Sequence, residues 1–443
     1  MSEIELSFAE EQLWLAEQAG ATAFPFFDCT RSLAVVVRLE NALSYHALRS
    51  SLDEIVRRHD VLRSRFEIRQ GQPARARRES SRADFTLIDL RQVGAATRPR
   101  VLRQVLERHV TRRFDLTRGP LLRAMLVRLA DDEHVFAIAV HHIVFDRWSR
   151  RVLAREIRQL YDAFVTGRPS GLEPLRARYR DYVQWQRNRL ETASGRELVT
   201  YWTAALDGLG PLPLSGDRGR AHVTSTRAGR WHFTIGAPDA SRLDATSRRC
   251  RVTLATAMLA ILAVLLSRLG GERDVAVGVP LPDRRRPEFE PLIGLFANVV
   301  IVRTAIAAGL TFPALLARVH RALLDACRYQ DLPYGRLLQI VEPATPLYRV
   351  VFNFLPEIPA SQMGLRGLRV TALKVPAEHL SLADLSFHVG HDSGELACGL
   401  VYKADLFSPA WAQAFAVQYQ GLVTAVLDEP QKDVGAYDLT ACR

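Results

Sequence analysis

The spacing of apolar residues predicts that helices and strands alternate along the chain. Between positions 44 and 59, Leu48, Leu52 and Ile55 recur every three or four residues, which is typical of the buried face of a helix. Positions 61–66 then follow the alternating pattern of a strand. A helix followed by a strand is therefore the predicted local order.

A second group of elements is predicted in the middle of the first half. Two apolar runs, 121–129 and 135–140, are separated by a short polar turn, which predicts a hairpin or two neighbouring strands. The second run is apolar on both faces, as in a buried strand. Apolar residues between 148 and 164 lie on one helical stripe, so a helix follows. Residues 141–147 form the loop between this strand and helix.

Further elements are predicted towards both ends of the chain. Ser7 and Glu10, three residues later, form a capping-box pattern, so a short helix should begin near Phe8. In the second half, helical and strand patterns are mixed. We predict helices over 253–268 and 312–327, and strands over 275–279, 299–304 and 349–354.

The length of the chain predicts two lobes. With 443 residues it exceeds the size at which one hydrophobic core usually keeps growing, about 250–300 residues. The stretch 166–174 carries two prolines and two glycines and is the best candidate for the boundary. We therefore predict an N-terminal lobe of residues 1–172 and a C-terminal lobe of residues 173–443.

Composition places the protein among compact globular chains: 48% of residues are hydrophobic and 24% are charged. The first ten positions hold three acidic residues and no basic one, so we predict no secretory signal and a cytoplasmic location. The apolar stretch 252–267 is too short to span a membrane and predicts a buried core helix. Five scattered cysteines predict reduced structural thiols and no metal site: Cys29, Cys250, Cys327, Cys398 and Cys442.

The formal charge of +11 raises the question of a nucleic-acid partner. A nucleic-acid-binding face should cluster its basic residues and interleave aromatic ones, whereas the arginines here are spread over every segment. This even distribution of arginines disfavours a nucleic-acid partner. The net positive charge suits an acidic protein partner.

Reactive side chains follow the buried strand in the run His141-His142-Ile143-Val144-Phe145-Asp146. If strand geometry persists through both histidines, their rings point to opposite sides, so one would be catalytic and the other structural. Histidine suits proton transfer near neutral pH, as an acyl transfer to an amine requires. Taken alone, these residues are equally compatible with a packed core pair or a metal site.

Residues 141–149, HHIVFDRWS, resemble the HHxxxDG core motif of nonribosomal peptide synthetase condensation domains, which belong to the chloramphenicol acetyltransferase-like superfamily. Other segments resemble the remaining family motifs, in family order and over nearly the whole chain. Among them are SFAEEQLWL from Ser7, RRHDVLRSRF from Arg57, VGVPLPDR from Val277, IGLFANVVIVR from Ile293 and YKADLF from Tyr402.

The resemblance implies an α/β fold of two acetyltransferase-like lobes in a V-shaped pseudo-dimer, with a central tunnel and His142 at its centre. In the family, acyl or peptidyl carrier proteins insert their phosphopantetheine arms into the tunnel, and the domain itself binds no cofactor. We therefore expect a condensation enzyme that joins a carrier-bound acyl thioester to an amine or hydroxyl acceptor, either carrier-bound or soluble. No adenylation or carrier domain fits in the chain, so we expect it to be free-standing. We also expect a monomer.

The resemblance also assigns roles around the motif. His142, His141 and Asp146 are the predicted catalytic residues, with Asp146 expected to be structural through a pair with Arg284. His142 would act as a general base or orient the attacking amine.

The next two residues of the motif, Trp148 and Ser149, are predicted to open the following helix as structural support, with the tryptophan buried.

Three further residues are predicted to contact substrate. Asn298 matches the asparagine of the family's FVNT motif near the tunnel, with backbone capping as the alternative. Ser386 is placed close to the tunnel. Arg147 stands where most members have glycine. We hypothesise that its guanidinium contacts a carboxylate or phosphate on the acceptor or on a carrier arm, the alternative being that it points away.

Two alternative functions stay open. One is an acyltransferase or epimerase that uses the same histidine on other substrates. The other is a non-catalytic recruitment module, because some family relatives keep the fold, lose the histidine motif and bind partner enzymes. The intact His141, His142 and Asp146 argue against the recruitment module.

Overall fold

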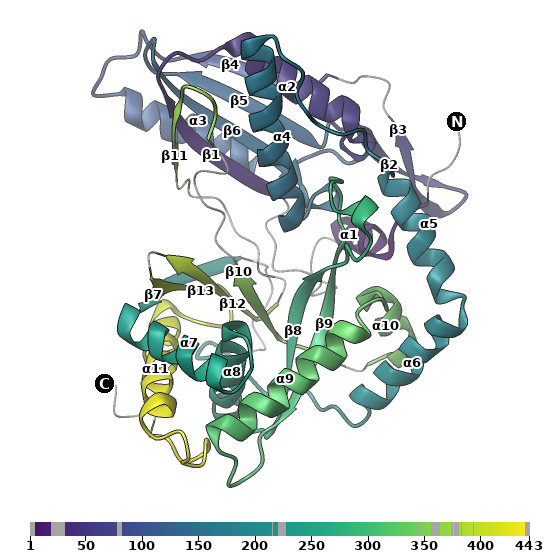
Figure 1. Cartoon of the computed structure of the whole chain (residues 1–443), viewed down its shortest axis with the longest axis vertical. Helices are drawn as coiled ribbons and strands as arrows, with labels where there is room; N and C mark the ends of the chain where they lie inside the picture. The colour runs from purple at the N-terminus through teal and green to yellow at the C-terminus, as the bar shows by residue number, and fades with distance from the viewer. Residues whose placement is uncertain are drawn as a thin grey trace.

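The computed structural model describes residues 5–18, 32–77, 82–214, 216–219, 227–343, 345–355, 364–373, 375, 381, 383–392 and 394–438. Two separate β-sheets, each with its own helices, form the two halves of the molecule (Figure 1). One half is built mainly from the first part of the chain and the other from the second.

The five-stranded sheet of the first half has the order β11-β1-β6-β5-β4. Neighbouring strands are antiparallel except β4 and β5, which are parallel. Helices α2 and α4 cover one face and α3 covers the other (Figure 1). The strands are β1 (Ser32–Glu40), β4 (Asp84–Asp89), β5 (Leu122–Arg128), β6 (Glu133–His141) and β11 (Arg369–Ala372); the helices are α1 (Phe8–Gln18), α2 (Tyr45–Arg58), α3 (Arg98–Thr111) and α4 (Arg147–Thr166).

The six-stranded sheet of the second half has the order β7-β13-β12-β10-β8-β9. Its helices α7, α8, α9 and α11 lie on the face turned away from the five-stranded sheet (Figure 1). The strands are β7 (Ala228–Ile235), β8 (Asp274–Pro282), β9 (Ala297–Ala305), β10 (Val350–Leu355), β12 (Leu385–Asp392) and β13 (Glu395–Lys403). The helices after α4 are α5 (Tyr179–Leu190), α6 (Ala193–Leu206), α7 (Ala237–Arg249), α8 (Leu254–Gly270), α9 (Phe312–Arg328), α10 (Tyr334–Val341) and α11 (Pro409–Asp428).

One strand of the first sheet comes from the second part of the chain. Strand β11 comes from the second part of the sequence, yet it pairs antiparallel with β1 at the edge of the first sheet, with Leu39 opposite Val370. A hairpin of β2 (Ser64–Arg69) and β3 (Gln72–Arg77) forms a separate two-stranded sheet. The division into residues 1–172 and 173–443 stays a prediction.

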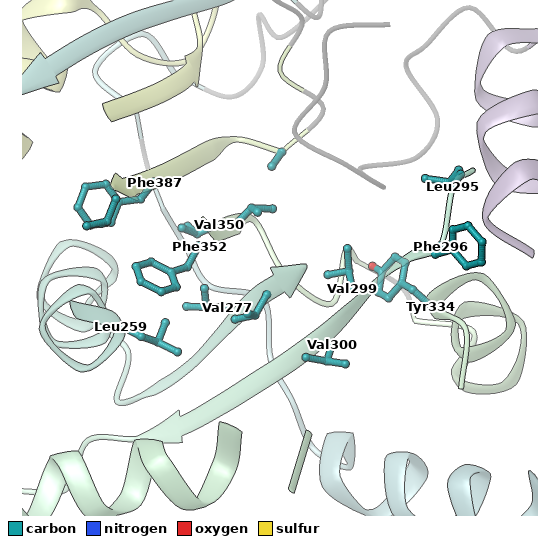
Figure 2. Packing of buried hydrophobic residues seen from close by; sticks show 14 of the residues in the cluster. Leu259, Val277, Leu295, Phe296, Val299, Val300, Tyr334, Val350, Phe352 and Phe387 are labelled. Carbon is teal, nitrogen blue, oxygen red and sulfur yellow. The ribbon is translucent and has the colours of Figure 1, made fainter. Parts of the chain in front are cut away.

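Helix α8 is the core helix that its apolar sequence predicted. Every residue from Thr256 to Ser267 is buried. Figure 2 shows Leu259 of this helix beside Val277 of β8 and Phe352 of β10. Over the described residues, no single helix is long and apolar enough to cross a membrane; α7 and α8 pass such a test only as a pair, which is bent by 105°.

Most predicted elements are confirmed, and one boundary is wrong. The strand expected over 61–66 begins only at Ser64, because residues 60–63 form a 3₁₀ turn. Val61 and Leu62 are neighbours in sequence and both are buried. A strand would turn one of the two away from the core, whereas the tight turn buries both.

Candidate active site

The catalytic motif begins where β6 ends. His141 is the last residue of the strand, and residues 142–144 turn at once into a 3₁₀ helix. The backbone N–H of Phe145 donates to the carbonyl of His142 at 3.0 Å and closes this turn. The strand geometry on which the prediction of opposite ring directions depended therefore stops between the two histidines.

His141 shapes the turn. Its Nδ1 accepts a hydrogen bond from the backbone N–H of Ile143 at 3.1 Å, so the ring proton lies on Nε2, which is 3.8 Å from Glu17 Oε1. The ring also packs edge to face against Phe114, with centroids 5.8 Å apart. These contacts favour His141 as the structural one of the two histidines, and its place among the catalytic residues stays a prediction.

His142 is 7% exposed, at the first position of the turn. Burial lowers the pKa of its imidazole, although the charge of Asp146 partly opposes this effect. The ring is therefore neutral at neutral pH, which is the form that can accept a proton from a nucleophile.

Asp146 is the N-cap of α4 and the centre of a buried network. Its Oδ1 accepts from the backbone N–H of Ser149 at 2.7 Å. Arg284 Nη2 lies 3.0 Å from Oδ1 and 3.3 Å from Oδ2, and the N–H of Phe296 donates to Oδ2 at 3.1 Å. The predicted ion pair with Arg284 is present. Because both carboxylate oxygens are engaged by the scaffold, Asp146 acts as a structural residue.

Arg284 and Ser149 bind a segment of the second half, residues 289–296. Arg284 Nη1 donates to the carbonyls of Phe289 at 2.9 Å and Leu292 at 2.5 Å. The Ser149 hydroxyl donates to the carbonyl of Gly294 at 2.8 Å and accepts from its N–H at 3.0 Å. The 289–296 segment is thus hydrogen-bonded directly to Ser149 in the first turn of α4.

Two residues that the sequence did not single out hold the same segment. His59 Nδ1 accepts from the N–H of Ile293 at 3.2 Å, while its Nε2 lies 2.9 Å from Glu156 Oε2. The Tyr179 hydroxyl donates to the carbonyl of Leu295 at 2.6 Å. Their partners are 234 and 116 residues away, so no local pattern could have identified these two residues.

A buried carboxyl group precedes Arg284 in the chain. Burial and the neighbouring Asp331 raise the pKa of Asp283 to about 7. The Tyr182 hydroxyl donates to Asp283 Oδ2 at 3.0 Å. No sequence pattern singled out Asp283, because the burial that perturbs it depends on tertiary packing.

Trp148 corrects one prediction, since its side chain is half-buried and not buried. The indole N–H donates to the carbonyl of Glu290 at 2.9 Å, and Arg151 lies 5.3 Å above the ring. A tryptophan that must reach a backbone carbonyl on the 289–296 segment keeps part of its ring in contact with water. The predicted start of the helix at this point is confirmed, because α4 begins at Arg147.

Asn298 uses its whole side-chain amide on the protein backbone, as in the capping alternative. Its Nδ2 donates to the carbonyls of Gln330 at 2.7 Å and Leu332 at 2.8 Å. Its Oδ1 accepts from the N–H groups of Val299 and Tyr334, each at 3.0 Å. An amide with two donors and two acceptor positions is thereby saturated, which favours the capping alternative. The substrate contact of Asn298 stays a prediction.

The other two predicted substrate contacts differ in accessibility. Ser386 is fully buried in β12 between Val351 of β10 and Val401 of β13, so its substrate contact stays a prediction. Arg147 is exposed at the first position of α4. Although solvent reaches it, surrounding protein removes much of its hydration and, with Arg150, lowers the pKa of its guanidinium to about 10. Among the described residues, no three acidic, histidine or cysteine side chains gather as a metal site.

Comparison with known proteins places this geometry in a family. The Condensation domain profile matches residues 3–442. The chain is 32% identical over 444 residues to malpinin synthetase of Mortierella alpina, with 99% of this chain but only 6% of that protein covered.

Solved structures show the same fold. The X-domain from teicoplanin biosynthesis superimposes with a TM-score of 0.86 at 26% identity, covering 99% of this chain and 98% of that one. The complex of the X-domain and OxyB from the same biosynthesis gives 0.84 at 26% identity, covering 99% and 96%. These similarities show the acetyltransferase-like α/β fold that the sequence motifs predicted.

Proposed function

Because this chain belongs to the condensation-domain family, we propose that it joins a carrier-protein-bound acyl thioester to an amine or hydroxyl acceptor. The product is an amide or an ester in nonribosomal peptide or hybrid polyketide biosynthesis. The observation that carries the proposal is His142, a buried imidazole whose pKa is lowered, at the end of a strand and in a turn fixed by its neighbours.

The reaction requires no redox step. The neutral acceptor nitrogen or oxygen attacks the thioester carbonyl carbon, its bond to that carbon forms, the carbon–sulfur bond breaks, and the thiol leaves with the acceptor's proton. His142 takes that proton during attack or orients the nucleophile by a hydrogen bond. The phosphopantetheine arms of the partner carrier proteins would supply proximity, so the domain itself needs no bound cofactor.

The scaffold around His142 supports this role by holding the motif rigidly. Asp146 and Arg284 fix the start of α4, and the 289–296 segment closes against both. A catalytic group must be held close to its productive geometry, because small displacements from it reduce the rate strongly.

The test is a reconstituted condensation. Candidate carrier proteins are loaded with acyl groups and incubated with a panel of amines and alcohols, and products are identified by mass. We expect product with the native protein, a loss of at least about 100-fold with His142→Ala, and an unchanged rate with His46→Ala, which alters an exposed histidine on α2. A native rate in His142→Ala would reject this assignment of the histidine.

A recruitment module is the second candidate, favoured by the similarity to an X-domain structure that contains a partner protein, OxyB. If the protein is a recruitment module, no combination of loaded carrier protein and acceptor should give product. A purified tailoring enzyme of the same pathway should then bind this protein with a defined stoichiometry. In that case His142→Ala would leave partner affinity unchanged.

A further inference from the structure

Two arginines at the start of α4 lack anionic partners. Arg147 is the first residue of the helix, and Arg150 follows one turn later on the same side. Across the part of the chain that the structure describes, neither side chain makes a hydrogen bond or an ion pair, and Arg150 Nε is buried without an acceptor. By contrast, the neighbouring Arg151 lies over the ring of Trp148.

The surroundings of these two guanidinium groups favour an anion. Loss of hydration lowers the pKa of both, and for Arg147 the charge of Arg150 adds to the effect. A buried N–H without an acceptor costs free energy that a bound carboxylate would recover. Two adjacent guanidinium groups can also bind one carboxylate together through charged hydrogen bonds.

An apolar pocket adjoins Arg150. Arg150 is the one charged residue in its lining, which otherwise consists of aliphatic and aromatic side chains from β1, β6 and α4, among them Val37, Ile138 and Ala154. Leu365, from the second half of the chain, closes one wall. The next residue, Arg366, pairs with Asp162 of α4 at 3.0 Å on the surface.

Along α4, the two arginines lie between the catalytic motif and the pocket. The helix starts directly after Asp146, so Arg147 lies at the end nearest the motif. Leu153 and Ile157, which line the pocket, follow about 9 and 15 Å further along the helix axis, at about 1.5 Å per residue. Along α4, the order is therefore the motif, then the two arginines, then the apolar pocket.

These three environments match the three groups on the α-carbon of an amino acid. We infer that the acceptor is a free apolar α-amino acid: Arg147 and Arg150 bind its carboxylate, its side chain enters the pocket, and its amine faces His142. This inference rests on the proposed function and names its acceptor. A carrier-bound amino acid has no free carboxylate, because that group forms the thioester, and would leave both arginines unpaired.

The phosphate of a carrier arm suits these arginines less well than a carboxylate does. The whole pantetheine chain separates that phosphate from the thioester sulfur, whereas Arg147 directly follows the motif residue Asp146. In the inferred reaction the neutral α-amine attacks the acyl carbon, a C–N bond forms and the C–S bond breaks. The amine proton leaves with the thiol, and the carboxylate stays unchanged and bound to the arginines.

The first experiment measures binding by calorimetry and does not depend on catalysis. L-Leucine and L-leucinamide, which lacks the carboxylate charge, are titrated into the native protein, the R147Q/R150Q variant and the control variant R151Q. We expect leucine to bind about 10- to 100-fold more weakly to R147Q/R150Q and unchanged to R151Q. Leucinamide should bind the native protein as weakly as leucine binds the double variant. Equal affinity of the native protein for leucine and leucinamide would overturn the inference.

A second variant tests the pocket. Ala154→Phe fills it, so leucine should bind at least about 10-fold more weakly, while glycine, which has no side chain to place there, keeps its affinity. Unchanged leucine affinity in Ala154→Phe would overturn the assignment of the pocket. Thermal melting confirms that each variant is folded before titration.

The condensation assay distinguishes failure of the inferred acceptor from failure of the proposed function. If carrier-bound leucine or leucinamide gives product and free leucine does not, the proposed function stands and the inference is wrong. If leucine binds through the arginines but no loaded donor gives product, the binding site stands and the proposed function fails.

Discussion

Replacing Arg284 with methionine should destabilise the protein by about 3–5 kcal/mol, the usual cost of removing one partner of a buried ion pair. Only 2% of the Arg284 side chain and 3% of that of Asp146 are exposed. The substitution leaves the Asp146 carboxylate buried without its counter-charge, and the carbonyls of Phe289 and Leu292 lose their donor. The free energy of unfolding should fall accordingly.

The assay is urea unfolding followed by circular dichroism, arranged as a double-mutant cycle with Asp146→Asn. Since both substitutions break the same pair, the double variant should lose about 2–3 kcal/mol less than the sum of the two single losses. Arg286→Met is the matched control. Its guanidinium is half exposed and pairs with Glu288 at 3.3 Å on the surface, so its loss should stay below about 1 kcal/mol.

Two results would refute this reasoning. A loss for Arg284→Met no larger than that for Arg286→Met would mean that the Asp146 carboxylate is not held as a buried charge. Strict additivity in the cycle would mean that Arg284 and Asp146 stabilise the fold independently. The activity of the folded Arg284→Met variant should also fall, because the start of α4 and the turn at His142 would lose their common support.

Three other measurements bear on single residues of the site. Burial lowers the pKa of His142, so NMR titration of its ring protons, assigned by comparison with His142→Ala, should give a midpoint below pH 6.5, the ordinary histidine pKa; a midpoint at or above 6.5 would contradict a buried neutral base. The pKa of Asp283 rises from about 3.9 in the unfolded chain to about 7 in the fold, so the free energy of unfolding should fall as the pH rises from 4 to 7. In urea titrations, Asp283→Asn should show a weaker dependence of this free energy on pH, and at pH 8 the variant should be more stable than the native protein by about 1–3 kcal/mol. Asn298→Ala should lower the melting temperature, through about 1–3 kcal/mol of unsatisfied backbone groups, without changing the affinity for the acceptor.

Local sequence patterns predicted elements well where one face of an element determines its structure. The helix expected over 44–59 is α2, with Ser44 as its N-cap, and the capping box at Ser7 is present, with the N–H of Ser7 2.8 Å from Glu10 Oε2. The apolar α8 is buried as expected. The prediction failed at 61–66, where two adjacent buried residues, Val61 and Leu62, lie in a 3₁₀ turn. Their apolar character is compatible with such a turn as well as with a strand.

The site was only partly predictable because its contacts join distant segments. Family resemblance identified the Asp146–Arg284 pair, whose partners are 138 residues apart. It did not identify the hydrogen bond between His59 and Ile293, or the role of Ser149 at Gly294, which depend on how the 289–296 segment packs against the first half. It left Asn298 as either a substrate contact or a backbone cap, and only the fold shows that Val299 and the loop at 330–334 occupy its amide.

The sequence grouped His141, His142 and Asp146 as catalytic, but their contacts suit them to different roles. Nδ1 of His141 is committed to the N–H of Ile143, so this ring cannot accept a proton there without breaking the turn. Both oxygens of Asp146 accept hydrogen bonds from the backbone and from Arg284, which directs the carboxylate into the scaffold. Under the proposed function, His142 is therefore the residue that takes the proton or orients the nucleophile, and the other two residues support the turn that carries it. Losing His141 or Asp146 should consequently reduce stability together with activity, whereas losing His142 should reduce activity far more than stability.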